Sequence, residues 1–505
     1  MPEKFKLLLV YPNIPLLNPP PVGIGSLTAV VRNAGHDVRV FDQTFYKGND
    51  PDSDKAQEEV LGVRPFEFEP RTLPEPKNDA ATDFLQVINE YKPDLIGISI
   101  LESTWDRATE LLDAIIGIEI PVLAGGVFPT FAQEIVLGHP AVDIVCEGEG
   151  EGPLVELCQK MKAGENYDSV KNLWCKKPDG SIKKNSIRTP IEIGDLPIPD
   201  YSVFESARFM RPMAGKIYRT APVETVRGCP YKCAFCNSPT MYDLYDREVK
   251  PGAFLRKKSI DQIQQELRAL RDDFNVEYFY FCSDTFLVMT DKEFEEFAEV
   301  YREFKLPFWL QSRPETIKPK HIKVLKEIGC HRISMGLEHG NEEFREKILK
   351  RRYKNEDIIQ VSKNLYDAGI ALSLNNILGF PGETRELIFD TIELNRKMYY
   401  DTTSGYAFTP FYGTELRTLS VEQGFIPTDY LSRTVTYGLG LDQPQLPKTE
   451  VDGLRRTFAL YAKFPKDWWP KIKIAEKKDE EGNKMFSHLS EVYREKYPYV
   501  NHYNE

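Results

Sequence analysis

Several features that would assign the chain to other classes of protein are missing. No stretch approaches the ~20 consecutive apolar residues that a membrane-spanning helix requires, and no apolar amino-terminal segment typical of a secretory signal is present. A long basic run is also missing, and the net charge of the 505 residues is −12. Nucleic-acid binding without sequence preference therefore has little support, because it requires a positively charged surface for the phosphates.

Cysteine is scarce, with eight residues in the whole chain. This is too few for the disulfide framework of a secreted protein, so we expect a reducing, cytoplasmic location. No second pair of closely spaced cysteines completes the four-ligand set that zinc prefers. Five cysteines stand alone and are interpreted as small buried apolar side chains: Cys146, Cys158, Cys175, Cys282 and Cys330.

The other three cysteines, Cys229, Cys233 and Cys236, form a C-x-x-x-C-x-x-C motif. This spacing places three thiols on one short loop. Three thiolates can hold a [4Fe–4S] cluster by three of its irons and leave the fourth iron without a protein ligand. An iron with an open position can chelate a small molecule and pass it an electron. We therefore interpret the loop as an iron–sulfur site, with zinc as the alternative.

Residues 1–165 alternate short apolar runs with helical patterns. The expected strands cover residues 5–11, 38–41, 94–100, 121–126 and 143–145, and the expected helices residues 23–33, 104–117, 130–138 and 151–162. This alternation predicts an α/β domain with a doubly wound, Rossmann-like parallel sheet. Residues 43–80 show no clear period and are interpreted as an insertion, and residues 166–205 as a connector with a hairpin.

The alternation resumes in six units within residues 206–415. The expected strands cover residues 223–226, 277–282, 308–311, 332–336, 371–378 and 405–409. Six strand–helix units predict a partial (β/α)6 barrel of TIM type, in which chemistry lies at the carboxyl ends of the strands. The cysteine motif directly follows the first of these strands. Residues 416–505 have a mostly helical pattern and are expected to form a domain that shapes the substrate pocket.

Polar residues or glycines follow the later barrel strands. Asp284 comes after the second strand, Arg313 after the third and Glu338 after the fourth, and residues 379–384 form a Gly-Phe-Pro-Gly-Glu-Thr loop after the fifth. Each could serve only the fold: Asp284 could cap a helix, and Arg313 could pair with a surface carboxylate. Their arrival at the same end of successive strands favours a shared binding site.

In this combination the motifs resemble the radical S-adenosylmethionine (SAM) superfamily, including the aromatic Phe235 before the last cysteine. The resemblance implies that Cys229, Cys233 and Cys236 hold a [4Fe–4S] cluster whose open iron chelates the amino and carboxylate groups of SAM. It also implies contacts to the rest of SAM: Asp284 with the amino group, Arg313 with the carboxylate, Glu338 with the ribose, and the main chain around Ile377, Gly379 and Phe380 with the adenine. Ser283 departs from the pattern, because relatives often have an aspartate there.

The first domain carries its own motifs at the expected strand ends. They are Pro-Pro-Val-Gly (20–23), Ala-Gly-His-Asp-Val (34–38), Gly-Gly-Val-Phe-Pro-Thr (125–130) and Gly-Glu-Gly-Glu (148–151). These resemble the cobalamin-binding domain of one branch of radical SAM enzymes, which implies a corrin site at Pro21, Gly23, Ser99, Gly125, Gly126, Thr130, Glu147, Gly148 and Glu149. The D-x-H-x-x-G motif that gives cobalt a histidine ligand is missing. We expect cobalamin without such a ligand, or else a sheet that has lost its ligand.

The commonest activity of that branch is methylation of unactivated carbon or phosphorus, which is the leading hypothesis here. The resemblance implies that SAM is cleaved to a 5′-deoxyadenosyl radical, that methylcobalamin supplies the methyl group, and that flavodoxin or ferredoxin donates the electron. We expect the substrate to be a small molecule or peptide. The alternatives are a radical SAM cyclase or oxidoreductase and a non-catalytic corrin or iron–sulfur sensor. A tRNA methylthiotransferase would need three further cysteines in the first domain, and none precedes Cys146.

Overall fold

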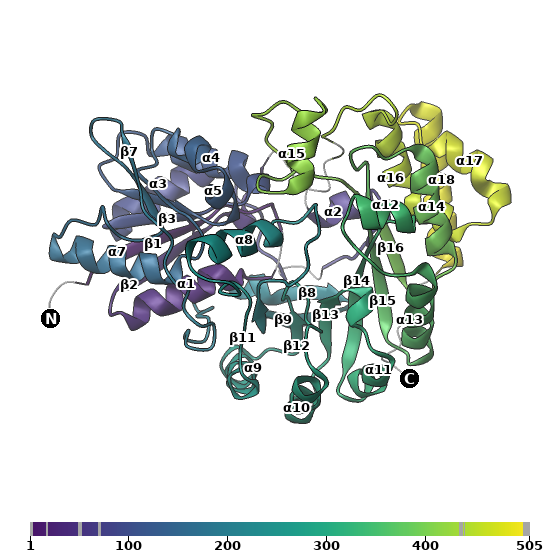
Figure 1. Ribbon diagram of the computed structural model, residues 1–505, viewed down its shortest axis with the longest axis horizontal. Coiled ribbons are helices and arrows are strands. Elements are labelled where there is room, and N and C mark those ends of the chain that lie inside the picture. The colour runs from purple at the N-terminus through teal and green to yellow at the C-terminus, as the bar shows by residue number, and fades with distance from the viewer. Residues whose placement is uncertain are drawn as a thin grey trace.

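The chain is organised around two seven-stranded sheets, each covered by helices (Figure 1). The computed structural model describes residues 4–16, 19–48, 53–68, 72–433, 438 and 440–497. Parts of the predicted insertion at 43–80 and the end of the predicted last domain lie outside these residues. Both predicted architectures, the doubly wound sheet and the partial barrel, are confirmed. The predicted domain boundaries stay a prediction.

The first sheet has the order β2-β1-β3-β4-β5-β6-β7. Five strands run parallel: β1 (Lys6–Tyr11), β2 (Asp37–Asp42), β3 (Leu95–Ser99), β4 (Val122–Gly125) and β5 (Ile144–Cys146). The predicted hairpin, β6 (Leu173–Lys176) and β7 (Ile182–Lys184), extends this sheet antiparallel. Alternate residues of β1 face opposite sides of the sheet, Leu7 and Leu9 towards one hydrophobic cluster and Leu8 and Val10 towards another. Apolar runs without alternation are typical of such strands, which are buried on both faces.

Helices cover both faces of this sheet. On one face lie α1 (Val22–Asn33) and α7 (Glu151–Ala163), and on the other α3 (Ala80–Tyr91) and α4 (Trp105–Ala114). Helix α3 was not predicted, because it directly follows the insertion without a period. The helix predicted at 130–138 is instead two short ones, α5 (Val127–Phe131) and α6 (Gln133–Leu137), separated at Ala132.

The second sheet has the order β16-β15-β14-β13-β12-β9-β8. Six strands are parallel and neighbour each other in chain order, as a partial barrel requires: β9 (Lys216–Val223), β12 (Tyr278–Phe281), β13 (Phe308–Ser312), β14 (Cys330–Glu338), β15 (Ala371–Leu378) and β16 (Thr402–Ala407). Strand β8 (Met210–Met213) runs antiparallel to β9. The first strand was predicted too late: it ends at Val223, and β10 (Val226–Arg227) pairs with β11 (Arg256–Lys257) instead.

The remaining helices cover the barrel or follow it. Those between its strands are α8 (Ser238–Glu248), α9 (Ile260–Phe274), α10 (Asp291–Tyr301), α11 (Pro319–Glu327), α12 (Glu342–Lys347), α13 (Asn355–Asp367) and α14 (Arg385–Arg396). The last helices are α15 (Glu415–Glu422), α16 (Lys448–Lys463), α17 (Trp469–Ala475) and α18 (Glu480–Lys496). Short 3-10 turns are η1 (Gln43–Phe45), η2 (Glu102–Thr104), η3 (Ser206–Phe209), η4 (Pro314–Thr316) and η5 (Lys466–Trp468). In the part of the chain described here, none of the helices has the length and apolarity needed to span a membrane.

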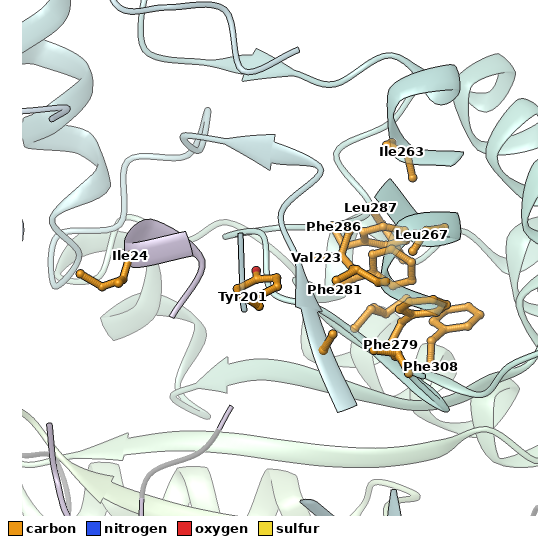
Figure 2. Close-up of a cluster of buried hydrophobic side chains, with 14 of the residues drawn as sticks. Ile24, Tyr201, Val223, Ile263, Leu267, Phe279, Phe281, Phe286, Leu287 and Phe308 are labelled. Carbon is orange, nitrogen blue, oxygen red and sulfur yellow. The ribbon is translucent and has the colours of Figure 1, made fainter. Parts of the chain in front are cut away.

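A continuous hydrophobic core joins the two sheets. Tyr201 is fully buried and lies between Ile24 of α1 and an aromatic group of the barrel that includes Phe281 (Figure 2). The Tyr201 hydroxyl donates to the carbonyl of Pro222 in β9 (3.4 Å). A Cβ at Gly25 of α1 would lie 2.9 Å from the Tyr201 ring, so this approach requires glycine. The core therefore fixes the first sheet against the first barrel strand, next to the cysteine motif.

The predicted insertion also reaches the barrel. It contains a short helix, α2 (Ser53–Glu58), which lies near β16 (Figure 1). The Tyr406 hydroxyl of β16 is 3.4 Å from Gln57 Oε1, and a Cβ at Gly62 would be 3.4 Å from Ser404 of the same strand. Leu61 joins the hydrophobic cluster formed with the last helices. A segment of the first half of the chain thus covers the last strand of the partial barrel.

Candidate functional site

The cysteine motif forms a loop between β10 and α8 that other segments hold in place. Gly228 has φ 91°, and a Cβ there would lie 2.9 Å from the carbonyl of Phe254. The Ala234 N–H donates to Leu349 O (3.2 Å), and the Ala234 carbonyl accepts from Leu416 N–H (3.0 Å). The loop is therefore anchored by segments that follow β14 and β16, both at the carboxyl ends of barrel strands.

The three thiols differ in surroundings. Cys233 is buried, whereas Cys229 and Cys236 are partly exposed. Burial raises the pKa of Cys229, and that of Cys236 to about 12. Cysteine binds metals as the thiolate, so a metal that binds here would have to displace the protons of these thiols.

The three-thiol donor set fits a cubane cluster. Among the described residues, no three Cys, His, Asp or Glu side chains converge on a position for a single metal ion. A [4Fe–4S] cluster does not require convergence, because it takes each thiolate at a different iron.

A cavity of about 320 Å³ lies at the carboxyl ends of the barrel strands, and we call it the barrel cavity. Five of the residues predicted to contact SAM line it, namely Phe235, Asp284, Arg313, Glu338 and Ile377. Further lining residues are Gln311, Ser312, Ser334, Gly336, Arg351, Asn375, Tyr406, Ala407, Phe408, Thr409 and Phe411. The barrel strands thus bring residues far apart in sequence to one cavity.

Glu338 enters the barrel cavity from an unusual backbone position. Its φ is 63°, which is uncommon for a residue with a side chain. Arg351 Nη1 donates to Glu338 Oε1 (3.0 Å), and Arg351 Nη2 to Gly336 O (2.8 Å). Burial raises the pKa of Glu338, and the Arg351 charge opposes that shift. A Cβ at Gly336 would meet the Glu338 carboxylate, so a larger residue there would displace that side chain. Sequence reasoning missed Arg351, which has no motif of its own.

Asp284 is shared between two cavities. It lines the barrel cavity and also a second cavity described below, and Ser238 Oγ donates to its Oδ2 (3.4 Å). Burial raises the pKa of Asp284, and the negative charge of Glu224 raises it further. The neighbouring Ser283 serves the loop: its hydroxyl accepts the N–H groups of Thr225 (2.9 Å) and Val226 (3.1 Å). Ser283, which departs from the family pattern, therefore fixes the backbone of the segment just before the cysteine loop.

Gly379 and Phe380 do not line the barrel cavity. Both N–H groups donate to Glu383 Oε2, the one of Phe380 at 3.0 Å, and the Phe380 ring is fully buried. Glu383 Oε1 is 3.0 Å from Nε2 of the buried His339. Their backbone donors are thus used within the protein, and a contact of these two residues with adenine stays a prediction. His339 is a buried neighbour of this loop.

The second cavity, of about 530 Å³, lies between the first sheet and the cysteine loop, and we call it the interdomain cavity. Six of the nine residues predicted to hold cobalamin line it: Gly23, Ser99, Gly125, Gly126, Gly148 and Glu149. Cys236, Asn237, Ser238, Met241, Cys282 and Asp284 line its other side. The cysteine loop therefore separates the two cavities, with Phe235 facing one and Cys236 the other.

The other three predicted cobalamin residues do not line this cavity. Thr130 joins its glycine turns, because its hydroxyl donates to Gly126 O (2.8 Å) and accepts from Gly148 N–H (3.0 Å). Glu147 accepts from Trp174 Nε1 (3.0 Å) and Gln133 Nε2 (2.9 Å). Pro21 precedes α1 as its N-cap. These positions support the cavity wall, and their contact with cobalamin stays a prediction.

A buried ionic network joins the cysteine loop to the first sheet. Arg227 lies two residues before Cys229 and contacts Glu151 (2.8 Å), Glu224 (2.9 Å) and Glu149 (3.3 Å). Arg256 also pairs with Glu149. Burial raises the pKa of Glu149, and the Arg227 charge opposes that shift. Sequence reasoning missed Arg227, Glu224 and Arg256, although the position of Arg227 next to the motif was a signal.

Comparison with known proteins agrees with this geometry. A model of the radical SAM superfamily matches residues 223–394, and a model of the B12 binding domain matches residues 68–158. An uncharacterized methyltransferase of Pyrococcus horikoshii is 26% identical, over 69% of this chain and 73% of its own length. Cytidylyl-2-hydroxyethylphosphonate methyltransferase of Streptomyces wedmorensis is 22% identical, over 89% of this chain and 86% of its own.

A solved structure has the same fold. The cobalamin-dependent SAM radical enzyme OxsB, with aqua-cobalamin and SAM bound, matches with a TM-score of 0.67 at 16% identity. The match covers 98% of this chain and 71% of that one. Both sheets and the helices around them therefore share one known architecture.

Proposed function

Because the chain belongs to the radical SAM enzymes that carry a B12-binding domain, we propose that it methylates an unactivated carbon or phosphorus atom of its substrate, using a [4Fe–4S] cluster, SAM and cobalamin. The observation that carries the proposal is the place of the cysteine loop between two cavities. One cavity belongs to the barrel and the other borders the first sheet. A substrate at their junction, near Asp284, would have access to both cofactors.

In this proposal the barrel cavity holds SAM. Asp284 accepts from the SAM amino group, Arg313 donates to its carboxylate and Glu338 accepts from the ribose hydroxyls, while Ile377 contacts the adenine. Charged partners at both ends suit a zwitterionic ligand. The cluster, when bound by Cys229, Cys233 and Cys236, supplies the electron that cleaves SAM.

The interdomain cavity is the proposed cobalamin site, and cobalamin supplies the methyl group. Glycines at the ends of β4 and β5 let the backbone approach a large planar ligand closely. Thr130 keeps those turns together, and Arg227 holds the cysteine loop at this side of the cavity. The protein residues thus set the distance between the two cofactors and limit the access of water.

An external one-electron donor of flavodoxin or ferredoxin type is part of the proposal, because radical SAM enzymes need one and such clusters can have very low potentials. We also propose a cytoplasmic location, where thiols stay reduced.

The test uses anaerobic, cluster-reconstituted protein with cobalamin, a reductant and SAM labelled in its methyl group. We expect the wild type to form both 5′-deoxyadenosine and labelled methylcobalamin, and Cys233→Ala to form neither. Cys330→Ala is the control, because Cys330 is a buried cysteine in β14 outside both cavities. Deoxyadenosine without labelled methylcobalamin would indicate a cyclase or oxidoreductase. Formation of neither product by protein that contains cluster and corrin would indicate a sensor and contradict the proposal.

A further inference from the structure

Arg313 contacts one of the cluster cysteines directly. Its Nη1 donates to Cys233 Sγ at 2.8 Å. Its Nε donates to Glu315 Oε1 (2.9 Å), its Nη2 contacts the same oxygen, and its guanidinium lies 3.8 Å from the centre of the Tyr231 ring. The Arg313 side chain is only 8% exposed. These contacts hold the guanidinium in one orientation against the cysteine loop.

The three cysteines receive different hydrogen bonds. Cys229 Sγ lies 3.8 Å from the Thr285 hydroxyl, and Cys236 Sγ accepts the Ser238 backbone N–H at 3.4 Å. Both donors are neutral. Within the described residues, Cys233 accepts a hydrogen bond from a guanidinium, whereas Cys229 and Cys236 do not. The loop therefore presents one electropositive corner to a bound cluster.

Reduction adds one electron to a [4Fe–4S] cluster, which takes it from the external one-electron donor without gaining a proton or breaking a bond. The added negative charge spreads onto the cysteine sulfurs. A cation that donates a hydrogen bond to one sulfur stabilises the reduced state more than the oxidised state. The effect is large in a buried site, where charge is weakly screened.

On the basis of the proposed function, we propose that Arg313 is a positioning residue that acts through Cys233 to raise the reduction potential of the cluster, and that Glu315 limits this effect as its counter-ion. An arginine side chain has five N–H donors, and the contacts above use three of them. The remaining two can still meet a carboxylate in the barrel cavity. The proposed role towards SAM and this role towards the cluster are therefore compatible.

The experiment measures the midpoint potential of the reconstituted cluster by EPR, without SAM and without cobalamin. Omitting SAM separates this role of Arg313 from the proposed contact with the SAM carboxylate. In Arg313→Gln we expect a more negative potential: at a fixed potential the reduced-to-oxidised ratio should fall about tenfold, which is a shift of about 59 mV for one electron. In Glu315→Gln we expect a shift in the opposite direction, because the guanidinium loses its counter-ion.

Arg332→Gln is the matched control. Arg332 is also buried, but it lies near the start of β14 and donates to the Ser373 hydroxyl. Its removal deletes the same charge and should leave the potential at the wild-type value.

Equal potentials in the wild type, Arg313→Gln and Glu315→Gln would overturn the inference, and so would shifts of both variants in the same direction. If Arg313→Gln does not retain a cluster, Glu315→Gln decides by the sign of its shift. Failure of the wild type to assemble any cluster would instead contradict the proposed function.

Discussion

Gly126 lines the interdomain cavity in a backbone conformation that favours glycine. Its φ is 111°, and a Cβ there would lie 2.7 Å from the carbonyl of Ile100. Gly35 also has a positive φ, of 85°, but no atom lies within 4 Å of the place where its Cβ would be. Comparing an alanine substitution at each glycine therefore separates the energetic cost of the positive φ from the cost of the collision with Ile100.

We predict that Gly126→Ala weakens cobalamin binding at least tenfold and destabilises the fold by roughly 2–3 kcal/mol, because strain and collision add. Gly35→Ala should cost about 1 kcal/mol and leave binding unchanged. Cobalamin titration followed by absorbance, with denaturant unfolding of both variants, measures these effects. Equal cobalamin affinities in the two variants would argue against the proposed corrin site.

At the residue scale, the sequence predicted side chains that stand at strand ends and missed their partners. Asp284, Arg313 and Glu338 were found because each follows an apolar strand directly. Arg351 and Arg227 were missed, since their partners are set by the way the chain folds back. Contact of the Gly379–Phe380 backbone with the adenine stays a prediction; the N–H groups of both residues bond to Glu383, and that pairing is not visible in the motif.

At the scale of elements, Glu476 at the end of α17 joins α14 and α16. It accepts from Arg385 of α14 (2.6 Å) and from the Tyr461 hydroxyl of α16 (2.5 Å). Burial of Glu476 acts to raise its pKa, but the hydrogen bonds from Arg385, Tyr461 and Lys473 outweigh burial and lower it. The three helices are therefore held together by one ionised carboxylate.

We predict that Glu476→Gln lowers the free energy of unfolding at pH 7 by roughly 3 kcal/mol, because it leaves the partly buried Arg385 without its full counter-charge. The folded-state pKa is below the ordinary value of 4.5. The ion contribution is therefore present above pH 4.5 and is lost as pH falls through the lower folded value. Urea unfolding at several pH values should show the difference between wild type and variant shrinking on acidification. A constant difference would contradict this assignment.

Elements were predictable where the local signals agreed. Helix α9 has a clear sequence signal, because it is strongly amphipathic and begins with a capping box of Ser259 and Gln262. Strand β9 was misplaced, since Lys216–Val223 mixes polar and apolar residues and only its end is apolar. Helix α3 went unpredicted because the preceding residues gave no period.

At the scale of the whole molecule, the two halves are joined by buried charges. Arg227, next to the cysteine motif, meets three glutamates, of which Glu149 and Glu151 follow β5 of the first sheet. The contact between α2 and β16 joins residues almost 350 positions apart. Neither contact could be predicted from one sequence, because no local pattern encodes which distant surfaces meet.

We predict that Arg227→Met lowers the free energy of unfolding by about 3–5 kcal/mol, because it leaves buried carboxylates unpaired. Adding Glu151→Gln to that variant should recover part of the loss. Arg268→Gln removes an exposed pair with Glu303 and should cost far less, because solvent screens exposed charges. Thermal unfolding of the wild type and these three variants measures the losses in stability. A loss for Arg227→Met no larger than that for Arg268→Gln would show that the network does not hold the halves together.

We propose that three cysteines hold a [4Fe–4S] cluster whose fourth iron is open to SAM. The most direct measurement is ENDOR spectroscopy of the reduced protein with SAM that carries ¹⁵N in its amino group. We predict a hyperfine coupling between the cluster and that nitrogen, which is lost in Cys233→Ala. A reduced cluster with SAM bound but without this coupling would contradict an open fourth iron.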